Sequence, residues 1–169
     1  PCEPNLLLSL ENESTVEEHK RVLARGYQSA VGMCLWAARC IKPECLYTMG
    51  QLCKVMSKPT EEAWKAVMHL IAYMYQHRHE GITFSSDGNH VPFFMTDASN
   101  KGDPIDSKRA YGYCAMWMGG PIIAVAKKLD HSSSATAANE YMVLRHSCKH
   151  AIWLRQLFEE IGLGEIVHD

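Results

Sequence analysis

Apolar residues recur with a helical period in the first half of the chain. In residues 60–76 they fall three or four positions apart, on one face of a helix: Ala63, Val67, Leu70 and Met74. Thr60 precedes this stretch as an N-cap, and Glu61 and Glu62 follow it in the first turn, where carboxylates favour the helix dipole. The pattern therefore predicts a helix that begins after Thr60.

Two further helices are predicted before this one. Thr15 and Glu18 have the spacing of a capping box, which predicts a helix from there to about residue 40, broken near Gly26 or Gly32. Pro43 suits a first helical turn and predicts a second helix that ends near residue 56. Residues 1–14 are polar and acidic, and we expect them to form a loose lead-in.

From residue 81 onward the pattern changes to that of strands. Four short apolar stretches are candidates: residues 82–84, 91–96, 111–118 and 122–126. Glycines between the last two predict a hairpin, and a helix over residues 137–161 follows. Residues 165–167 are interpreted as the start of another strand. The predicted fold class is α+β, with a helical segment followed by an antiparallel three-stranded sheet and a long helix.

Composition narrows the class of protein without naming a partner. The chain has 169 residues, of which 47% are hydrophobic, which is enough for a core. Its formal net charge of -2 excludes binding of nucleic acid by bulk positive charge, although a local basic stripe is compatible with it. Lys54, Lys58 and Lys65 could form such a stripe facing phosphates, or a solvated helix face.

Cysteine usage and hydropathy bear on the compartment. The seven cysteines form no Cys-x-x-Cys pair, and their odd number argues against a disulfide framework or a zinc module. We expect them to be reduced and mostly in the core. No apolar stretch approaches the roughly 20 residues that a membrane span needs, and the amino terminus has no signal pattern. An intracellular protein without a membrane partner is predicted.

Two acidic residues are the strongest candidates for chemistry. Asp97 follows the apolar run 91–96, so its carboxylate is expected at the end of a buried strand, and Glu140 lies near the start of the long helix. Two carboxylates on rigid elements suit a magnesium site for phosphodiester chemistry. Without further support, however, an Asp at a strand end is usually a turn former or N-cap, and Glu140 is interpreted as a solvated surface residue.

Other polar residues have simpler interpretations. His146 and His150 have the i, i+4 spacing of a zinc pair, but no third ligand is apparent, so we interpret them as exposed. Asp103 and Asp106 are interpreted as solvated loop acids.

Several short strings occur together in one known family. They are residues 27–32 (YQSAVG), 50–52 (GQL), 56–60 (MSKPT), 64–67 (WKAV), 96–99 (TDAS), 102–104 (GDP), 139–142 (NEYM) and 151–155 (AIWLR). With these strings, residues 27–161 resemble the segment of a copia-type LTR retrotransposon Pol polyprotein that joins the reverse transcriptase to its ribonuclease H.

The resemblance implies a division of the chain and an activity. Residues 1–14 would be a linker, residues 15–80 a helical reverse transcriptase thumb or connection region, and residues 81–169 an incomplete ribonuclease H-like domain, truncated at its C-terminus. Ribonucleases H of this family hydrolyse the RNA strand of RNA–DNA hybrids by two-metal catalysis. The implied partners are an RNA–DNA hybrid or template–primer duplex and the rest of the Pol polyprotein, in a cytoplasmic particle or the nucleus.

The resemblance also implies roles for single residues. The family's first two catalytic acids correspond to Asp97 and Glu140, which would bind Mg²⁺, with Mn²⁺ as an alternative. Ser99 and Asn139 lie beside them and would contact the minor groove of the hybrid. The lysines at positions 54, 58 and 65 would contact nucleic acid phosphates.

The chain departs from the family pattern in two places. Many copia-type sequences have a second acid where this chain has Ser99, and the third acid normally lies in an Asp-Asn string, which this chain lacks. We therefore predict little or no nuclease activity for the isolated chain. A catalytically inactive binding or connection module, or a structural fragment of a decayed element, is the alternative.

Overall fold

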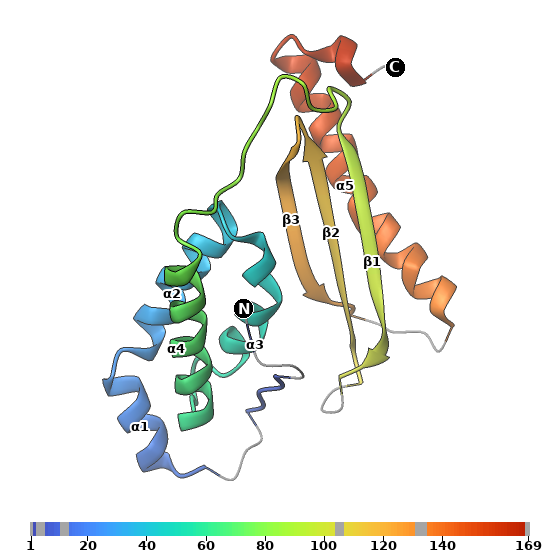
Figure 1. Ribbon diagram of the computed structural model, residues 1–169. Coiled ribbons are helices and arrows are strands. Elements are labelled where there is room, and N and C mark those ends of the chain that lie inside the picture. The colour runs from blue at the N-terminus through green and yellow to red at the C-terminus, as the bar shows by residue number, and fades with distance from the viewer. Residues whose placement is uncertain (1, 3–5, 11–13, 104–106, 131–134, 168–169) are drawn as a thin grey trace. The chain divides into compact units, whose positions relative to one another are not determined.

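The structure consists of two compact units, Pro1–Gly81 and Ile82–Asp169, which are described separately. It is a computed structural model that describes residues 2, 6–10, 14–103, 107–130 and 135–167. Figure 1 labels the main helices and strands. No helix in these described ranges is long and apolar enough to cross a membrane.

The first unit is helical. Its elements are α1 (Val16–Ala24), α2 (Tyr27–Cys40), the 3-10 turn η1 (Pro43–Cys45), α3 (Leu46–Lys54) and α4 (Glu61–Gln76). The predicted break near the first glycine is confirmed, because Gly26 separates α1 from α2 with a φ of 88°, a left-handed conformation that glycine adopts without strain. The predicted cap of α4 is also confirmed, since the Thr60 hydroxyl accepts the N–H of Ala63 at 3.1 Å.

The helices pack around an apolar centre. Val22, Tyr27, Leu52 and Leu70 are fully buried there. The Tyr27 hydroxyl donates to the carbonyl of Leu52 at 2.9 Å, which satisfies the one polar group that this ring brings inside, and burial raises the pKa of that hydroxyl. Leu8 is 2% exposed in the same cluster, so the expectation of a loose lead-in is wrong at this residue. Burying its side chain stabilises the segment.

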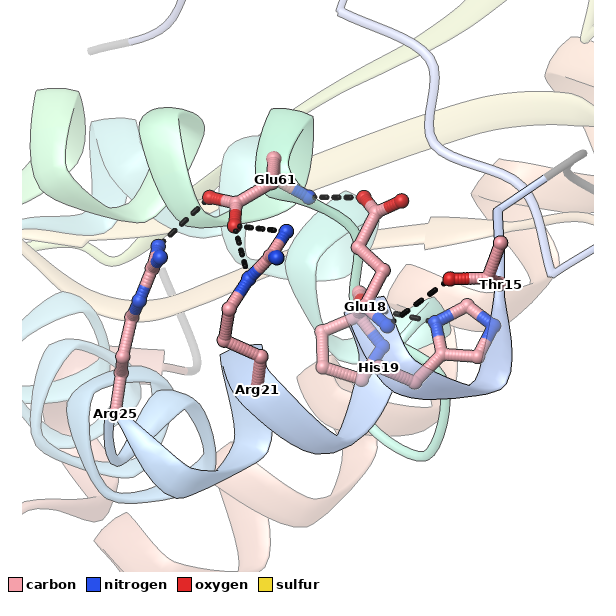
Figure 2. Close-up of polar contacts among 7 residues, drawn as sticks. Thr15, Glu18, His19, Arg21, Arg25 and Glu61 are labelled. Carbon is pink, nitrogen blue, oxygen red and sulfur yellow. Dashed lines mark hydrogen bonds and ion pairs between the residues drawn. The ribbon is translucent and has the colours of Figure 1, made fainter.

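Polar contacts join α1 to the start of α4 (Figure 2). Thr15 caps α1 by accepting the N–H of Glu18, and the Glu18 carboxylate accepts the N–H of Glu61 at 2.8 Å. The Glu61 carboxylate in turn accepts from Arg25 at 2.7 Å and from Arg21. The hydrogen bond from Arg25 is the main reason that the pKa of Glu61 is lowered. The first turn of α4 is therefore tied to α1 by charged groups that neutralise one another.

The second unit is a three-stranded antiparallel sheet with a long helix along one face, as Figure 1 shows. Its elements are β1 (Phe93–Gly102), β2 (Arg109–Trp117), β3 (Gly120–Lys128), α5 (Thr136–Glu160) and the 3-10 turn η2 (Gly164–Val167). The predicted α+β class is confirmed, and the arrangement is consistent with a partial ribonuclease H-like fold. The hairpin is also confirmed, with Met118 and Gly119 as its two-residue loop, both at positive φ.

Three predicted strands differ in the structure. Residues 82–84 form no strand. The strand predicted over 91–96 begins at Phe93 and continues to Gly102, because β2 provides pairing partners as far as Arg109. Residues 165–167 belong to η2 instead of a strand, because Gly162, with a φ of 80°, turns the chain back onto the end of α5. There the N–H of Leu163 donates to the carbonyl of Phe158 at 2.7 Å.

Candidate functional site

Asp97 lies in the middle of a strand, not at its end. It is the fifth residue of β1 and pairs with Gly112 of β2. Its side chain is exposed. The expectation of a carboxylate at a strand terminus is therefore wrong, because the ladder continues through Ala98 and resumes at Gly102 after an irregularity. The backbone that carries this carboxylate is still rigid, since paired strand residues have little backbone freedom.

The pairing register assigns Asp97 to one face of the sheet. Ala98 pairs with Tyr111, and both are buried. Tyr111 stacks on His146 of α5, with ring centroids 5.4 Å apart, so this is the face that α5 covers. Side chains alternate between the two faces along a strand. Asp97 therefore belongs to the opposite, open face, together with the exposed side chain of Met95.

Glu140 belongs to the helix that covers the other face of the sheet. It is the fifth residue of α5 and is exposed. His146 lies level with Tyr111 and Ala98. Glu140 precedes His146 by more than one and a half helical turns. Glu140 therefore lies on the helix that covers the face of the sheet opposite to the one to which Asp97 belongs. No cluster of three His, Cys, Asp or Glu side chains in the described part of the chain could hold a metal ion.

The two residues expected beside the acids differ in accessibility. Ser99 is half-buried in β1. Asn139 is 1% exposed, and its amide donates to the carbonyl of Ala135 at 3.0 Å. In this structure the Asn139 side chain is therefore held against the start of α5 and is not presented to a nucleic acid.

Asp103 is a buried structural residue. Its carboxylate is ion-paired with Lys128 of β3. Its backbone N–H donates to the carbonyl of Lys108 at 2.8 Å, which closes the connection from β1 to β2. The interpretation of Asp103 as a solvated loop acid is wrong, because the strand pairing brings Lys128 next to it. Asp106 lies outside the described residues.

His146 and His150 face the sheet instead of solvent. The Tyr113 hydroxyl and Nδ1 of His150 form a hydrogen bond of 2.6 Å. Burial raises the pKa of Tyr111 and Tyr113, with Asp130 adding to the effect on Tyr111, so both hydroxyls stay neutral. The two histidines therefore form part of the seam between β2 and α5. Their i, i+4 spacing could have indicated this, since it also places two residues on one packing face.

The predicted lysines lie at the end of α3, in the following turn and on α4. Lys54 is half-buried and donates to the side chain of Gln51 at 3.2 Å. Lys58 and Lys65 are exposed, as a phosphate contact requires. Their exposure is compatible with both interpretations of these lysines, a solvated face and a phosphate-facing stripe.

One surface was missed by sequence reasoning, the outer face of α2. Its exposed residues Ser29, Met33, Trp36 and Cys40 are three or four positions apart, and exposed Gly32 lies next to Met33. Trp36 is 70% exposed and Met33 is 65% exposed. A Cβ added at Gly32 would meet nothing within 4 Å, so this face is open and shallow. The signal in the sequence was a tryptophan one turn after a glycine, on the side opposite the buried residues Val31 and Cys34.

Comparison with known proteins finds relatives among retrotransposon Pol polyproteins. The chain is 28% identical over 152 residues to a retrovirus-related Pol polyprotein from transposon TNT 1-94 of Nicotiana tabacum, a match that covers 90% of the chain. It is 25% identical over 138 residues to the Pol polyprotein from transposon RE2 of Arabidopsis thaliana, over 81% of the chain. The chain is a homologue of retrotransposon Pol polyproteins. The resemblance to copia-type Pol polyproteins is thereby confirmed.

The extent of these matches differs among the relatives. The chain spans 11% of the TNT 1-94 polyprotein and 9% of the RE2 polyprotein. A secreted RxLR effector protein of Plasmopara viticola is 26% identical over 128 residues, and there the match covers 90% of that protein and 76% of the chain. No family model matches the sequence. No solved structure matches it either.

Proposed function

We propose that this Pol segment contacts a double-stranded nucleic acid, an RNA–DNA hybrid or template–primer duplex, through the outer face of α2. The observation that carries the proposal is Trp36, a large aromatic side chain that is 70% exposed in a helix of the Pol-like region. Apolar surface of this kind, on a helix that is otherwise well packed, marks an interaction site. The helical unit would then act as the thumb or connection region that the resemblance implies.

The chemistry of this face suits a duplex of A-like form. Such duplexes have a wide, shallow minor groove that is recognised mainly by shape. Gly32 carries no side chain, so the backbone of α2 can approach closely, while Trp36 and Met33 supply a flat apolar surface for the sugars. The exposed Lys58 and Lys65 would bind phosphates elsewhere on the unit. The binding would depend on shape and salt more than on base sequence.

A binding measurement with a fluorescent RNA–DNA hybrid tests this proposal. We expect Trp36→Ala to weaken binding about tenfold, since burying a large apolar side chain against the sugars contributes roughly 1.5–3 kcal/mol. Changing Lys58 and Lys65 together to glutamate should lower the slope of log K against log salt by about one for each lysine that binds a phosphate. Fluorescence anisotropy at several salt concentrations measures both effects.

Trp153→Ala is the matched control, because Trp153 is also an exposed tryptophan on a helix, 52% exposed, but belongs to the second unit. The affinity of the Trp153→Ala variant for the hybrid should equal that of the unchanged chain. Equal losses of affinity for both tryptophans, or no binding of the hybrid by the unchanged chain, would contradict the proposal.

Hybrid cleavage by the second unit stays a separate prediction. It rests on the resemblance of residues 96–99 and 139–142 to the family's first two acidic positions. Asp97 faces away from the side of the sheet that α5 covers, which does not fit a Mg²⁺ shared with Glu140, so no catalytic step is assigned to the pair. We expect the isolated chain to leave a labelled hybrid intact in Mg²⁺ or Mn²⁺. Cutting that Asp97→Asn abolishes would instead support a catalytic role for Asp97.

The second candidate function is a non-catalytic binding or structural module. The effector relative favours it, since the match covers 90% of that protein, so a protein of about this extent exists apart from a Pol polyprotein. Neither binding nor cleavage of the hybrid by the unchanged chain would support the structural form of this candidate.

A further inference from the structure

Three sulfur-bearing side chains lie together on the open face of the sheet in the second unit. Cys114 and Met116 are two residues apart on β2, so they project from the same face of the strand. This is the open face, because Tyr113, the residue before Cys114, packs on His150 of α5 on the opposite side. Met95 of β1 pairs with Cys114 across the ladder, which places both side chains on this face.

The two sulfur atoms of β2 are in contact. The Cys114 thiol donates to Sδ of Met116 at 3.6 Å. With metal–sulfur bonds of about 2.3 Å, as in zinc thiolates, two sulfurs bound to one tetrahedral or trigonal ion lie roughly 3.8–4.0 Å apart. The separation in the structure is close to this distance, so one metal ion can bind both sulfurs after only a small movement of the side chains.

Met95 is positioned to supply a third sulfur. The Cβ atoms of directly opposite residues in an antiparallel pair are roughly 4.5–5.5 Å apart, and methionine has three rotatable bonds with which to adjust. Met95 is 51% exposed, so its thioether has room to turn toward Cys114. The residue that pairs with Cys114 on the other side is Ala124, which is too small to cover the thiol. Asp97 is exposed on the same face, where its carboxylate favours a cation.

We propose that Met95, Cys114 and Met116 form a binding site for a soft monovalent metal ion, Cu(I). Thiolate and thioether sulfurs select Cu(I), whereas Mg²⁺ prefers oxygen ligands and zinc takes cysteine, histidine and carboxylate ligands. Binding of Cu(I) replaces the thiol proton of Cys114, which passes to solvent, so that the sulfur coordinates as a thiolate. This inference does not depend on nucleic acid binding by the outer face of α2.

NMR of isotope-labelled methionine methyl groups in the full chain tests the site, with Ag(I) as a redox-stable probe of the same softness as Cu(I). We expect saturating Ag(I) to shift the methyl signals of Met95 and Met116, because each methyl group is bonded to a coordinating sulfur. Cys114→Ser should abolish both shifts. The signal of Met68, an exposed methionine of α4, is the control and should not move.

Competition with a chromophoric Cu(I) chelator, under reducing conditions without dioxygen, measures the affinity. We expect Met95→Leu and Met116→Leu each to weaken Cu(I) binding by at least about tenfold, since losing a residue that merely supports a metal ligand already costs about 10–100-fold. Leucine preserves the volume of methionine, so the sheet should stay folded. Both variants keep all seven cysteines, so binding to other thiols is unchanged. Met68→Leu is the matched control and should bind Cu(I) as the unchanged chain does.

Two results would overturn the proposal. One is equal Cu(I) affinity in all three Met→Leu variants, and the other is methyl shifts that persist in Cys114→Ser or do not include Met95 and Met116. Either result would mean that the metal binds only adventitiously, at exposed thiols such as Cys40 and Cys148.

Discussion

Leu70→Ala should lower the free energy of unfolding of the helical unit by about 2–5 kcal/mol. Leu70 is fully buried in α4, where its side chain packs in the same cluster as Tyr27 and Leu52. Removing it takes away the transfer free energy of its methyl and methylene groups and leaves a cavity. The surrounding helices can close such a cavity only in part, because Glu61 at the start of α4 is tied to Arg21 and Arg25 of α1.

Hydrogen exchange followed by mass spectrometry measures this effect unit by unit. Peptides from the Pro1–Gly81 unit should lose protection, and peptides from the Ile82–Asp169 unit should keep theirs. Met68→Ala is the control, since Met68 lies two residues away on the same helix but is 45% exposed. If Leu70→Ala lowers protection as little as the Met68→Ala control does, the stability of the helical unit does not depend on Leu70.

Gly88→Ala should destabilise the second unit by roughly 1–3 kcal/mol, because the added carbon overpacks the structure. A Cβ at Gly88 would lie 2.5 Å from the carbonyl carbon of Met118 and 2.7 Å from the nitrogen of Gly119. Both atoms belong to the backbone of the hairpin loop, so neither can rotate aside. The substitution must therefore push the segment around Gly88 away from the hairpin.

That segment is held by several hydrogen bonds, which the displacement would strain. The N–H of Ser85 donates to the carbonyl of Met118 at 2.8 Å, and the N–H of Met118 donates to the carbonyl of Asn89 at 3.0 Å. The Trp117 indole N–H donates to the carbonyl of His90 at 2.8 Å. The change should appear as a lower midpoint of chemical denaturation.

Gly81→Ala provides the matched comparison. A Cβ there would meet nothing within 4 Å, and its φ is not in the left-handed region. The same substitution should therefore change the denaturation midpoint little at this position. If Gly88→Ala and Gly81→Ala behave alike, the close packing of residues 85–90 on the hairpin loop does not exist in solution.

Local patterns predicted most of the secondary structure, because they report on one element at a time. The Thr60 cap and the four-residue apolar spacing after it were sufficient to place α4. The glycines around residue 119 were sufficient to place the hairpin. The strand over residues 82–84 was wrong because an apolar stretch does not by itself provide a pairing partner. The Ile82 and Phe84 side chains instead pack close to Gly120 of β3.

The candidate sites depended on information that local patterns do not contain. Sequence spacing placed Asp97 and Glu140 on rigid elements, and the structure agrees that both are on regular elements. Whether they face each other depends on strand register and on which face of the sheet α5 covers. A shift of one residue in register would move Asp97 to the other face. The pairing of Asp97 with Gly112 decides which face of the sheet Asp97 lies on, and the identity of the residue does not.

By itself, the sequence determined the order of helices and strands, the mixed α+β class and the kinship with Pol polyproteins, because these depend on short-range periodicity and on strings of adjacent residues. Only the tertiary structure decided that Leu8 is buried, that Asp103 pairs with Lys128 and that Trp36 is exposed. The physical reason is that burial and ion pairing are set by partners distant in the sequence, and packing alone selects those partners.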